Sequence, residues 1–176
     1  MDYQLINSSV MKQQIIEWLK AQLQDKPAVI GLSGGVDSAV VTALCVQAIG
    51  PDRVYGMLLP GDPDAEKLAN QLGIKTSQRS IDPIVQTIVA DQTISQLSLG
   101  NVKARVRMTL LYLQANEVSG LVVGTGNKTE LLLGYFTKYG DGGVDLLPLA
   151  GLYKTQVWQL AQELAIPEAI INKTPS

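Results

Sequence analysis

The sequence predicts an α/β fold, a doubly wound and Rossmann-like parallel sheet with helices on both faces. Short apolar segments with the character of buried strands alternate along the chain with longer segments of helical periodicity. Turns that contain Gly or Pro separate these segments. Because parallel strands need crossover connections, the alternation favours a sheet covered on both faces. Ligands of such sheets bind beyond the carboxyl ends of the strands, so the loops after the strands are the first candidates for a site.

Four segments are predicted to be strands. Each is short, and most are rich in Val, Ile and Leu, as expected where both faces of a strand are buried. They span residues 28–32, 54–59, 74–81 and 121–123.

The helices are predicted from apolar residues spaced three and four positions apart. The first takes Ser8 or Ser9 as its N-cap and runs to about residue 24. The others span residues 39–49, 64–72, 101–116 and 152–165, and the segment 82–98 is only weakly helical. Residues 134–151 are glycine-rich and lack periodicity, which indicates a long functional loop.

Charge and composition exclude several classes of protein. The formal net charge is −2, whereas a general nucleic-acid or membrane-surface binder is basic. The chain has no histidine, which rules out Ser-His-Asp chemistry, Cys-His chemistry and His-ligated zinc. Its one cysteine, Cys45, is expected to be a core thiol, and a chain without disulfides suits a reducing cytoplasm. We expect neither a signal peptide nor a membrane span, because no sufficiently long apolar run is present.

The most informative motif is SGGVDS at residues 33–38, which turns a predicted strand sharply into a predicted helix. Glycines let the backbone approach a ligand closely, and the free N–H groups at a helix start suit a phosphate. Ser33 and Ser38 can add hydroxyl donors. The carboxylate of Asp37 would repel a bare phosphate, but it suits a Mg²⁺ ion held between it and phosphate oxygens. The motif has neither the Lys of a Walker loop nor the spacing of a dinucleotide fingerprint.

A second polar segment, GTGNKTE at residues 124–130, also follows a predicted strand. Thr125 and Asn127 can contact a base or ribose. Glu130 has two interpretations, a second Mg²⁺ ligand beside Asp37 or a carboxylate that favours the start of a helix.

Basic residues in the helix at 101–116 form another candidate cluster. Arg105 and Arg107 are two positions apart, so they diverge on a helix and cannot both face one ligand squarely. Together with Lys103 they form either a clamp for phosphate or carboxylate groups or a solvated basic face.

The glycine-rich loop supplies charged and aromatic side chains. The segment 136–154 contributes two lysines and two aspartates, which can neutralise phosphates and also hold a cation: Lys138, Asp141, Asp145 and Lys154. The aromatic side chains either pack against a flat heterocycle or anchor the loop to the core. These aromatic residues are Tyr135, Phe136 and Tyr139.

SGGVDS resembles the pyrophosphate loop of the ATP-pyrophosphatase superfamily, whose fold is similar to that of adenine nucleotide α-hydrolases. Six motifs together resemble the NAD synthetase family, from about residue 8 to the end of the chain. They occur in the order SGGVDS, GNVKARVRM, GTGNKTE, GYFTKYGDGGVDLLPL, LYKTQVW and INKTPS. The fourth is the most specific, because it separates this family from other pyrophosphate-loop enzymes.

The resemblance implies a ligase that adenylates deamido-NAD with ATP and then amidates it with ammonia to give NAD and AMP. Mg²⁺ is the implied cofactor and ATP the co-substrate. The implied ATP-binding residues are Gly31, Leu32, Ser33, Gly34, Gly35, Val36, Asp37, Ser38, Thr125, Lys154 and Ser176. The implied metal ligands are Asp37 and Glu130, and the implied contacts to deamido-NAD are Arg105, Lys138 and Asp145. The implied catalytic residues are Asp141, Lys138 and Lys154.

The resemblance also implies a homodimer. The apolar stripe of the helix at 101–116, which includes Val102, Val106, Leu110 and Leu113, is a candidate interface, although the same stripe can simply face the sheet. Ammonia is the expected nitrogen donor, unless the chain is one piece of a larger glutamine-using protein with a glutaminase domain.

The chain departs from the family pattern in two places. The loop after about residue 60 is short, and the sequence stops at Ser176 where relatives continue. We therefore expect a single domain over residues 1–176 that lacks a C-terminal segment and a loop after about residue 60. Two other functions stay open, a pyrophosphate-loop ATP pyrophosphatase with a different acceptor and a non-catalytic ATP-binding relative.

Overall fold

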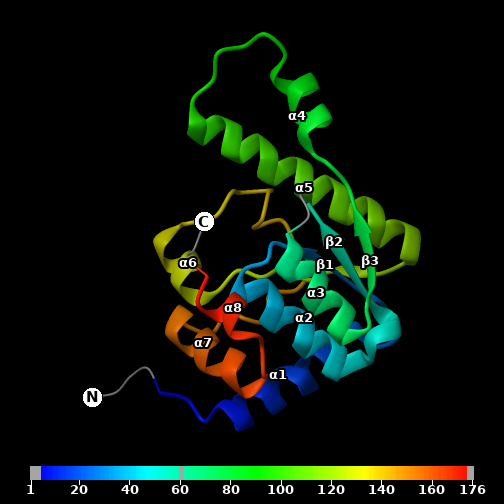
Figure 1. Cartoon of the computed structure of the whole chain (residues 1–176), viewed down its shortest axis with the longest axis vertical. Helices are drawn as coiled ribbons and strands as arrows, with labels where there is room; N and C mark the ends of the chain where they lie inside the picture. Colours follow the sequence, from blue (N-terminus) through cyan, green and yellow to red (C-terminus); the bar gives the residue numbers. More distant parts are fainter. Residues whose placement is uncertain (1–4, 60–61, 174–176) are drawn as a thin grey trace.

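The computed structural model describes residues 5–59 and 62–173 and confirms the predicted α/β fold. Four parallel strands form one sheet in the order β3-β2-β1-β4. Figure 1 labels β1, β2 and β3. Ala28 pairs with Val54 on one side and with Leu121 on the other, so β1 lies in the centre. The strands are β1 (Ala28–Leu32), β2 (Val54–Leu58), β3 (Lys75–Gln78) and β4 (Leu121–Val122).

Helices cover both faces of this sheet. One face carries α1 (Ser8–Leu23), α2 (Val36–Ile49), α3 (Pro63–Leu72), α7 (Lys154–Glu163) and α8 (Glu168–Ile171). The other carries α5 (Gln96–Val118), with α4 (Asp82–Val89) packed beside it. A short 3₁₀ helix, η1 (Pro51–Arg53), precedes β2, and α6 (Lys128–Leu133) follows β4. None of the described helices combines the length and the apolar character that a membrane span requires.

The alternation of side chains along β1 divides the core into two layers. Ala28, Ile30 and Leu32 pack with the helices of the α2 face, whereas Val29 packs towards α5. Gly31 also faces α5, where Leu111 Cδ1 lies 3.5 Å from the position a Cβ would take. The helix α5 therefore packs closely on the carboxyl end of β1, where the glycine turn at 33–38 begins.

The α4 helix and the first half of α5 project from the rest of the molecule (Figure 1). A separate apolar cluster holds them against the end of β2, with Met57 and Leu59 from the strand side meeting Val85, Val106 and Leu110. This cluster fixes the direction of α5, and α5 in turn carries the basic residues of the candidate site.

Several predicted boundaries were wrong. The N-cap of α1 is Asn7, whose side chain accepts a hydrogen bond from Val10 N at 3.1 Å, and not Ser8 or Ser9. The second helix begins at Val36 and not at residue 39, so Asp37 and Ser38 belong to its first turn. The predicted strand at 74–81 is shorter, Lys75–Gln78, and the weakly helical segment contains α4 and the start of α5.

Candidate active site

The loop between β1 and α2 has the geometry of an anion-binding turn. Gly34 adopts φ +78°, a left-handed conformation that L side chains rarely adopt. The serine hydroxyls bond mainly within the loop: Ser38 Oγ donates to Gly35 O at 2.9 Å, and Gly35 N donates to Ser33 Oγ at 3.2 Å. These bonds hold the loop in shape at the amino end of α2, where free backbone N–H groups favour an anion.

Three chain segments meet at Asp37, in the first turn of α2. One carboxylate oxygen accepts a hydrogen bond from Asn127 Nδ2 at 3.0 Å, and the other pairs with the ammonium group of Lys154. Lys154 is the first residue of α7, and its backbone N–H donates to Thr129 Oγ1 in α6 at 3.1 Å. The starts of α2, α6 and α7 are thereby joined around one partly buried carboxylate.

Glu130 lies beside this group because of a capping box at the start of α6. Asn127 Oδ1 accepts from Glu130 N at 3.1 Å, and Asn127 N donates to Glu130 Oε2 at 3.0 Å. Burial raises the pKa of the Glu130 carboxyl group, and the charges of Asp37 and Asp141 raise it further, against the opposing effects of the Asn127 N–H and Lys154. The negative charges of Asp37 and Asp141 therefore repel that of Glu130, and a bound cation would reduce this repulsion.

The side chain of Asn127 was predicted to contact a base or ribose, and the structure corrects this. Asn127 is fully buried, and its side chain bonds to Asp37 and Glu130. The capping-box pattern was visible in the sequence, but the bond to Asp37, ninety positions away, was not.

The pair Asp37 and Glu130 fits Mg²⁺ better than a metal held by protein alone. Within residues 5–59 and 62–173, no three His, Cys, Asp or Glu side chains gather closely enough to hold a metal ion. Mg²⁺ commonly binds through one or two carboxylates together with phosphate oxygens and waters. Two carboxylates beside a phosphate-binding loop supply that donor set.

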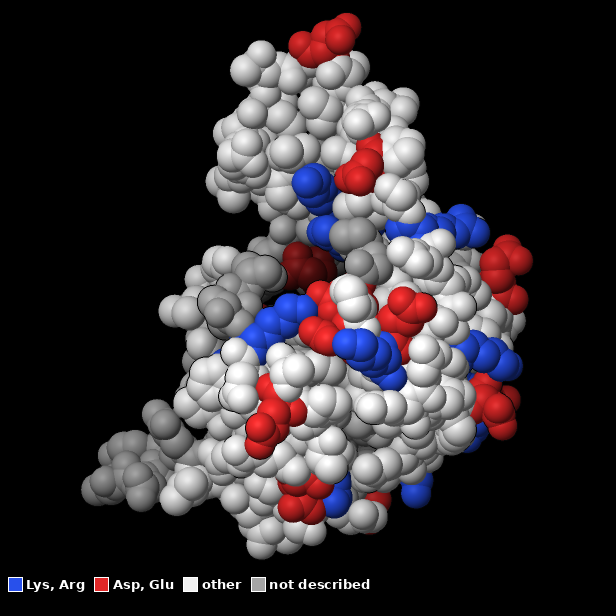
Figure 2. All heavy atoms as spheres, viewed as in Figure 1, with Lys and Arg blue, Asp and Glu red and all other residues white. Residues whose placement is uncertain are grey.

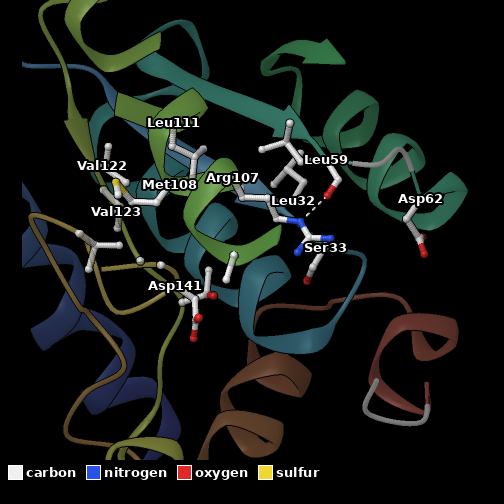
Figure 3. A pocket seen from close by; sticks show the side chains of 16 residues that line it. Leu32, Ser33, Leu59, Asp62, Arg107, Met108, Leu111, Val122, Val123 and Asp141 are labelled. Carbon is white, nitrogen blue, oxygen red and sulfur yellow. Dashed lines mark hydrogen bonds between the residues drawn. The ribbon is translucent and has the colours of Figure 1, made fainter. Parts of the chain in front are cut away.

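A cavity of about 450 Å³ opens next to the phosphate loop, between the ends of β1 and β4 and the helix α5. Acidic and basic side chains gather around a hollow on this side of the molecule, between the α4–α5 projection and the rest (Figure 2). The lining is mainly apolar, and its polar side chains are Ser33, Asp62, Arg107, Thr125 and Asp141 (Figure 3). Its apolar members include Leu32, Leu59, Met108, Leu111, Val122, Val123 and Val144. A space of this size with few polar groups suits a flat heterocycle.

Arg107 is the basic residue of α5 that enters this cavity. Its Nε donates to Leu59 O at 2.7 Å, and Figure 3 draws its guanidinium group on the side of the cavity where Ser33 lies. Burial lowers the pKa of Arg107, and Asp141 and Asp82 oppose this effect. The sequence left Arg107 open between a clamp for phosphate or carboxylate groups and a solvated basic face, and the resemblance did not name it as a site residue. Ala104, Arg107, Met108 and Leu111 follow the three-and-four spacing of one helix face, and all four line the cavity.

Arg105 lies outside the cavity, as its divergence from Arg107 predicted. Its Nε donates to Lys138 O at 3.3 Å, which joins α5 to the glycine-rich loop. Lys138 is exposed, with its ammonium 5.0 Å from the centre of the Tyr139 ring. Asp141 lines the cavity and accepts a hydrogen bond from Thr137 N at 2.9 Å. The structure thus joins the side chain of Arg105 to the backbone of Lys138, and Asp141 lies near enough to raise the pKa of Glu130.

Asp145 has a structural role as well as its implied role in binding. One oxygen accepts from Val122 N at 2.8 Å and the other from the Tyr112 hydroxyl at 3.0 Å. Burial of Tyr112 and its bond to Asp145 raise the pKa of the phenol to about 12. Asp145 therefore ties the glycine-rich loop to β4 and α5.

The remaining predicted residues fall into three groups. Gly31, Leu32, Ser33 and Thr125 line the cavity, whereas Val36 is buried at the start of α2. Ser176 lies outside the described residues.

Of the three aromatic residues in the loop, Tyr135 and Tyr139 are 73% and 66% exposed, so they do not anchor the loop to the core. Phe136 packs beside Gly142, where a Cβ would come within 2.6 Å of the ring.

Asp62 is a further charged group at the phosphate loop that sequence reasoning missed. Its carboxylate caps α3 by accepting from Asp64 N at 2.9 Å, and it pairs with Lys173 at 2.5 Å. The hydrogen bond from Lys173 lowers the pKa of Asp62 below its ordinary value of 3.8. The carboxyl group lies so close to Gly34 that a Cβ on that glycine would overlap it. The segment 62–64 and the end of the described chain therefore meet at the glycine turn.

Comparisons with known proteins agree with this geometry. A family model described as NAD synthase matches residues 11–176. The chain is 50% identical over 163 residues to the NH(3)-dependent NAD(+) synthetase of Methanosarcina mazei, a match that covers 86% of this chain and 64% of that protein.

Two solved structures are similar as well. NMN synthetase from Francisella tularensis superposes with a TM-score of 0.92 at 35% identity, covering 98% of this chain and 76% of that one. The NH3-dependent NAD synthetase from Campylobacter jejuni, solved with a nitrate ion, gives a TM-score of 0.91 at 32% identity, covering 98% and 80%.

The parallel sheet, the glycine turn after β1 and the carboxylates beside it define a nucleotide-binding α/β domain of the pyrophosphate-loop type. Within that class, the chain belongs to the NAD synthase family. It spans 64% of the length of the Methanosarcina mazei relative.

The two glycines of the loop should differ in their tolerance of a side chain. Gly34→Ala would place a Cβ against Asp62 in a left-handed backbone, and we expect a loss of ~1–3 kcal/mol in the free energy of unfolding. Gly35→Ala is the matched control, because its backbone is extended, at φ −89° and ψ 161°, and its nearest neighbour is Ser33 Oγ at 3.4 Å. Urea unfolding at pH 7 measures both. Equal losses in the two variants would contradict this account of the loop.

The pairing of Asp62 with Lys173 should make stability depend on pH in the acid range. Because the folded-state pKa of Asp62 lies below its ordinary 3.8, the pair stabilises the fold above that pH and stops doing so as the pH falls through the folded value. We therefore expect Lys173→Gln to lower the urea midpoint at pH 7, and the difference from the unsubstituted protein to vanish below the folded pKa. Lys26→Gln, at an exposed position, is the control. A difference that stayed constant from pH 7 to pH 3 would show that the ion pair is not its source.

Proposed function

We propose that this protein is an ATP-dependent ligase that makes NAD from deamido-NAD and ammonia. The observation that carries the proposal is the group formed by Asp37, Asn127, Glu130 and Lys154 beside a phosphate-binding turn. Membership of the NAD synthase family and the ammonia-dependent names of two relatives support it.

ATP is proposed to bind with its phosphates on the turn at 33–38. Asp37 and Glu130 would hold Mg²⁺, which supplies charge neutralisation to the phosphates when it is bound. Lys154 would then turn from Asp37 to a phosphate oxygen, since the ammonium already lies at the turn. Thr125, at the wall of the cavity, is proposed to contact the nucleoside part of ATP.

The chemistry needs two displacements and no covalent enzyme intermediate. The carboxylate of the nicotinate ring attacks the α-phosphate and pyrophosphate leaves, which gives an acyl adenylate. Ammonia then attacks the acyl carbon and AMP leaves with the bonding electrons. Ammonium must lose a proton first, and Asp141 is proposed to orient it or to accept that proton. Lys138 and Lys154 stabilise the negative charge that develops.

Arg105, Lys138 and Asp145 are proposed to contact deamido-NAD. Arg105 bonds to the backbone of Lys138, so the two positive charges lie on adjoining segments, which suits an anionic dinucleotide. Asp145 is held by Val122 N and Tyr112, so we propose that it shapes this wall and meets polar groups of the substrate from a fixed position. Cytoplasmic location, which the single buried cysteine favours, is proposed with this activity.

A second acceptor for the same chemistry is nicotinic acid mononucleotide. The observation that favours it is the similarity to NMN synthetase from Francisella tularensis. The reacting carboxylate is the same in both acceptors, so the phosphate-loop residues do not discriminate between them.

The other two functions have less support. An acceptor outside this group would not explain the match to the NAD synthase model over residues 11–176. A non-catalytic ATP-binding relative would not explain why Asp37, Glu130 and Lys154 lie together beside the turn that is proposed to bind the phosphates.

The first test is pyrophosphate release from ATP and Mg²⁺, followed by an assay for NAD. We expect release that depends on deamido-NAD, and NAD when ammonium is added. Asp37→Asn should lower turnover by ~100-fold or more, as is typical when a group that stabilises transition-state charge is removed. Asp52→Asn, an exposed carboxylate in η1, is the control and should keep full activity.

The arms of this assay separate the candidates. Nicotinic acid mononucleotide in place of deamido-NAD tests the second acceptor, and glutamine in place of ammonium tests the nitrogen source. ATP binding without pyrophosphate release, with either acceptor, would overturn the catalytic proposal in favour of a binding role.

A homodimer is also proposed, with α5 as the contact. Val106 and Leu110 are buried within the chain and pack with its own core, so these two positions face inward. Leu113 and Leu97, 44% and 76% exposed, remain on the outer surface of the same helix. A second copy of the chain would bury this exposed apolar area.

The oligomeric state should follow this surface. Light scattering after gel filtration should give a mass of about twice the 18.9 kDa of one chain, and Leu113→Glu should shift it towards one chain. Leu132→Glu, on α6 and 68% exposed, is the matched control that should leave the dimer intact. A single-chain mass for the unsubstituted protein, or dissociation by the α6 variant alone, would contradict α5 as the contact.

A further inference from the structure

Asn127 contacts both carboxylates that are proposed to hold Mg²⁺. Its Nδ2 donates to Asp37 Oδ1 at 3.0 Å, and its Oδ1 accepts from Glu130 N at 3.1 Å. Its backbone N–H donates to Glu130 Oε2 at 3.0 Å. Asn127 itself is fully buried. One residue therefore fixes the positions of Asp37 and Glu130, which come from different helices.

Helix capping alone does not explain these contacts. A cap needs only the side-chain oxygen, which Ser or Thr supplies as well. The amide N–H group is the part that a hydroxyl cannot replace at the same reach, and it is directed at Asp37. With Lys154 on the second oxygen, the amide leaves the Asp37 carboxylate little freedom to rotate.

The neutral amide also suits its place between two carboxylates. Lys154, the charged donor already on Asp37, is proposed to turn to a phosphate when ATP binds, whereas a charged donor in the buried position of Asn127 would stay and compete with a metal ion. An amide N–H donor orients Asp37 and leaves the charge of the carboxylate available. Metal sites commonly depend on such supporting hydrogen bonds to their ligands.

We propose that Asn127 is a positioning residue, which holds Asp37 and Glu130 in the arrangement that takes up Mg²⁺ together with ATP. The inference rests on the proposed function. It assigns no contact between Asn127 and the nucleotide, because the side chain is buried and its bonds are made within the protein.

The test separates positioning from capping. Asn127→Ser keeps an N-cap oxygen and removes the donor to Asp37. Asn7→Ser is the matched control, because Asn7 caps α1 through the same kind of bond and has no carboxylate partner in its capping bond. The probe is Mn²⁺, titrated by electron paramagnetic resonance in the presence of α,β-methylene-ATP, with the analogue also titrated without metal.

For Asn127→Ser we expect Mn²⁺ affinity to fall ~10-fold or more, while affinity for the analogue without metal changes by less than about 2-fold. The Mg²⁺ concentration for half-maximal turnover should rise by a similar factor. In an Asp37→Ala background the same substitution should have little further effect on Mn²⁺, because Ser keeps the capping contacts to Glu130 and the amide N–H has lost Asp37 as its acceptor. Asn7→Ser should change none of these values, and circular dichroism verifies that each variant is folded.

The outcomes are distinguishable. Two results would overturn the inference while the unsubstituted protein still makes NAD. One is unchanged Mn²⁺ affinity in folded Asn127→Ser. The other is a fall in Mn²⁺ affinity on adding Asn127→Ser to Asp37→Ala that equals the fall in the unsubstituted background. If the unsubstituted protein binds no Mn²⁺ with the analogue and makes no NAD, the proposed function fails together with the inference. If Asn127→Ser does not fold, the same measurements are made on Asn127→Thr, which also keeps a capping hydroxyl but has a bulkier side chain.

Discussion

The carboxylate of Asp37 is the point on which the arrangement of the site depends. It lies in the first turn of α2, and its two oxygens bond to a residue before α6 and to the first residue of α7. These helices follow β1, β4 and the glycine-rich loop, which are far apart in the sequence. A partly buried carboxylate without partners would be costly, so Asn127 and Lys154 must stay close to it in the folded chain. The loops that follow the strands therefore converge on one place.

The same bonds prepare the chemistry. Lys154 neutralises Asp37 in the free protein, and a cation with bound phosphates would offer both groups new partners of opposite charge. Exchange of this kind keeps each charge paired before and after ATP binds, which limits the reorganisation needed during the reaction. The Asp62 carboxylate follows a related principle on the other side of the glycine turn. It would repel phosphate, yet its pairing with Lys173 keeps a cation at the same position.

The parts of the site that local sequence determines were predictable. The turn at 33–38 follows from glycines between a strand and a helix, and Asn127 with Glu130 follows from the spacing of a capping box. The divergence of Arg105 and Arg107 follows from helix geometry alone, and the two side chains do bond to different segments. The predicted N-cap of α1, Ser8 or Ser9, was wrong by one or two residues, because Asn and Ser cap almost equally well and local preference does not separate them from Asn7. The shortness of β3 reflects its position at the sheet edge, where only β2 pairs with it.

The contacts that tertiary packing creates were not predictable in this way. Asn127 carries the same local pattern whether or not a carboxylate lies within reach of its amide, so only the fold reveals that Asp37 is the partner. Arg107 is the opposite case: the sequence allowed both an anion clamp and a solvated basic face, and the structure places this side chain in the cavity between α5 and the sheet. Ala104, Leu110 and Leu111 are three of the four residues three or four positions from Arg107, and all three are apolar, which is the sequence signal for an inward-facing side chain. A polar residue with mostly apolar neighbours of this kind favours the buried side of a helix, and at the carboxyl end of a parallel sheet that side faces the ligand site.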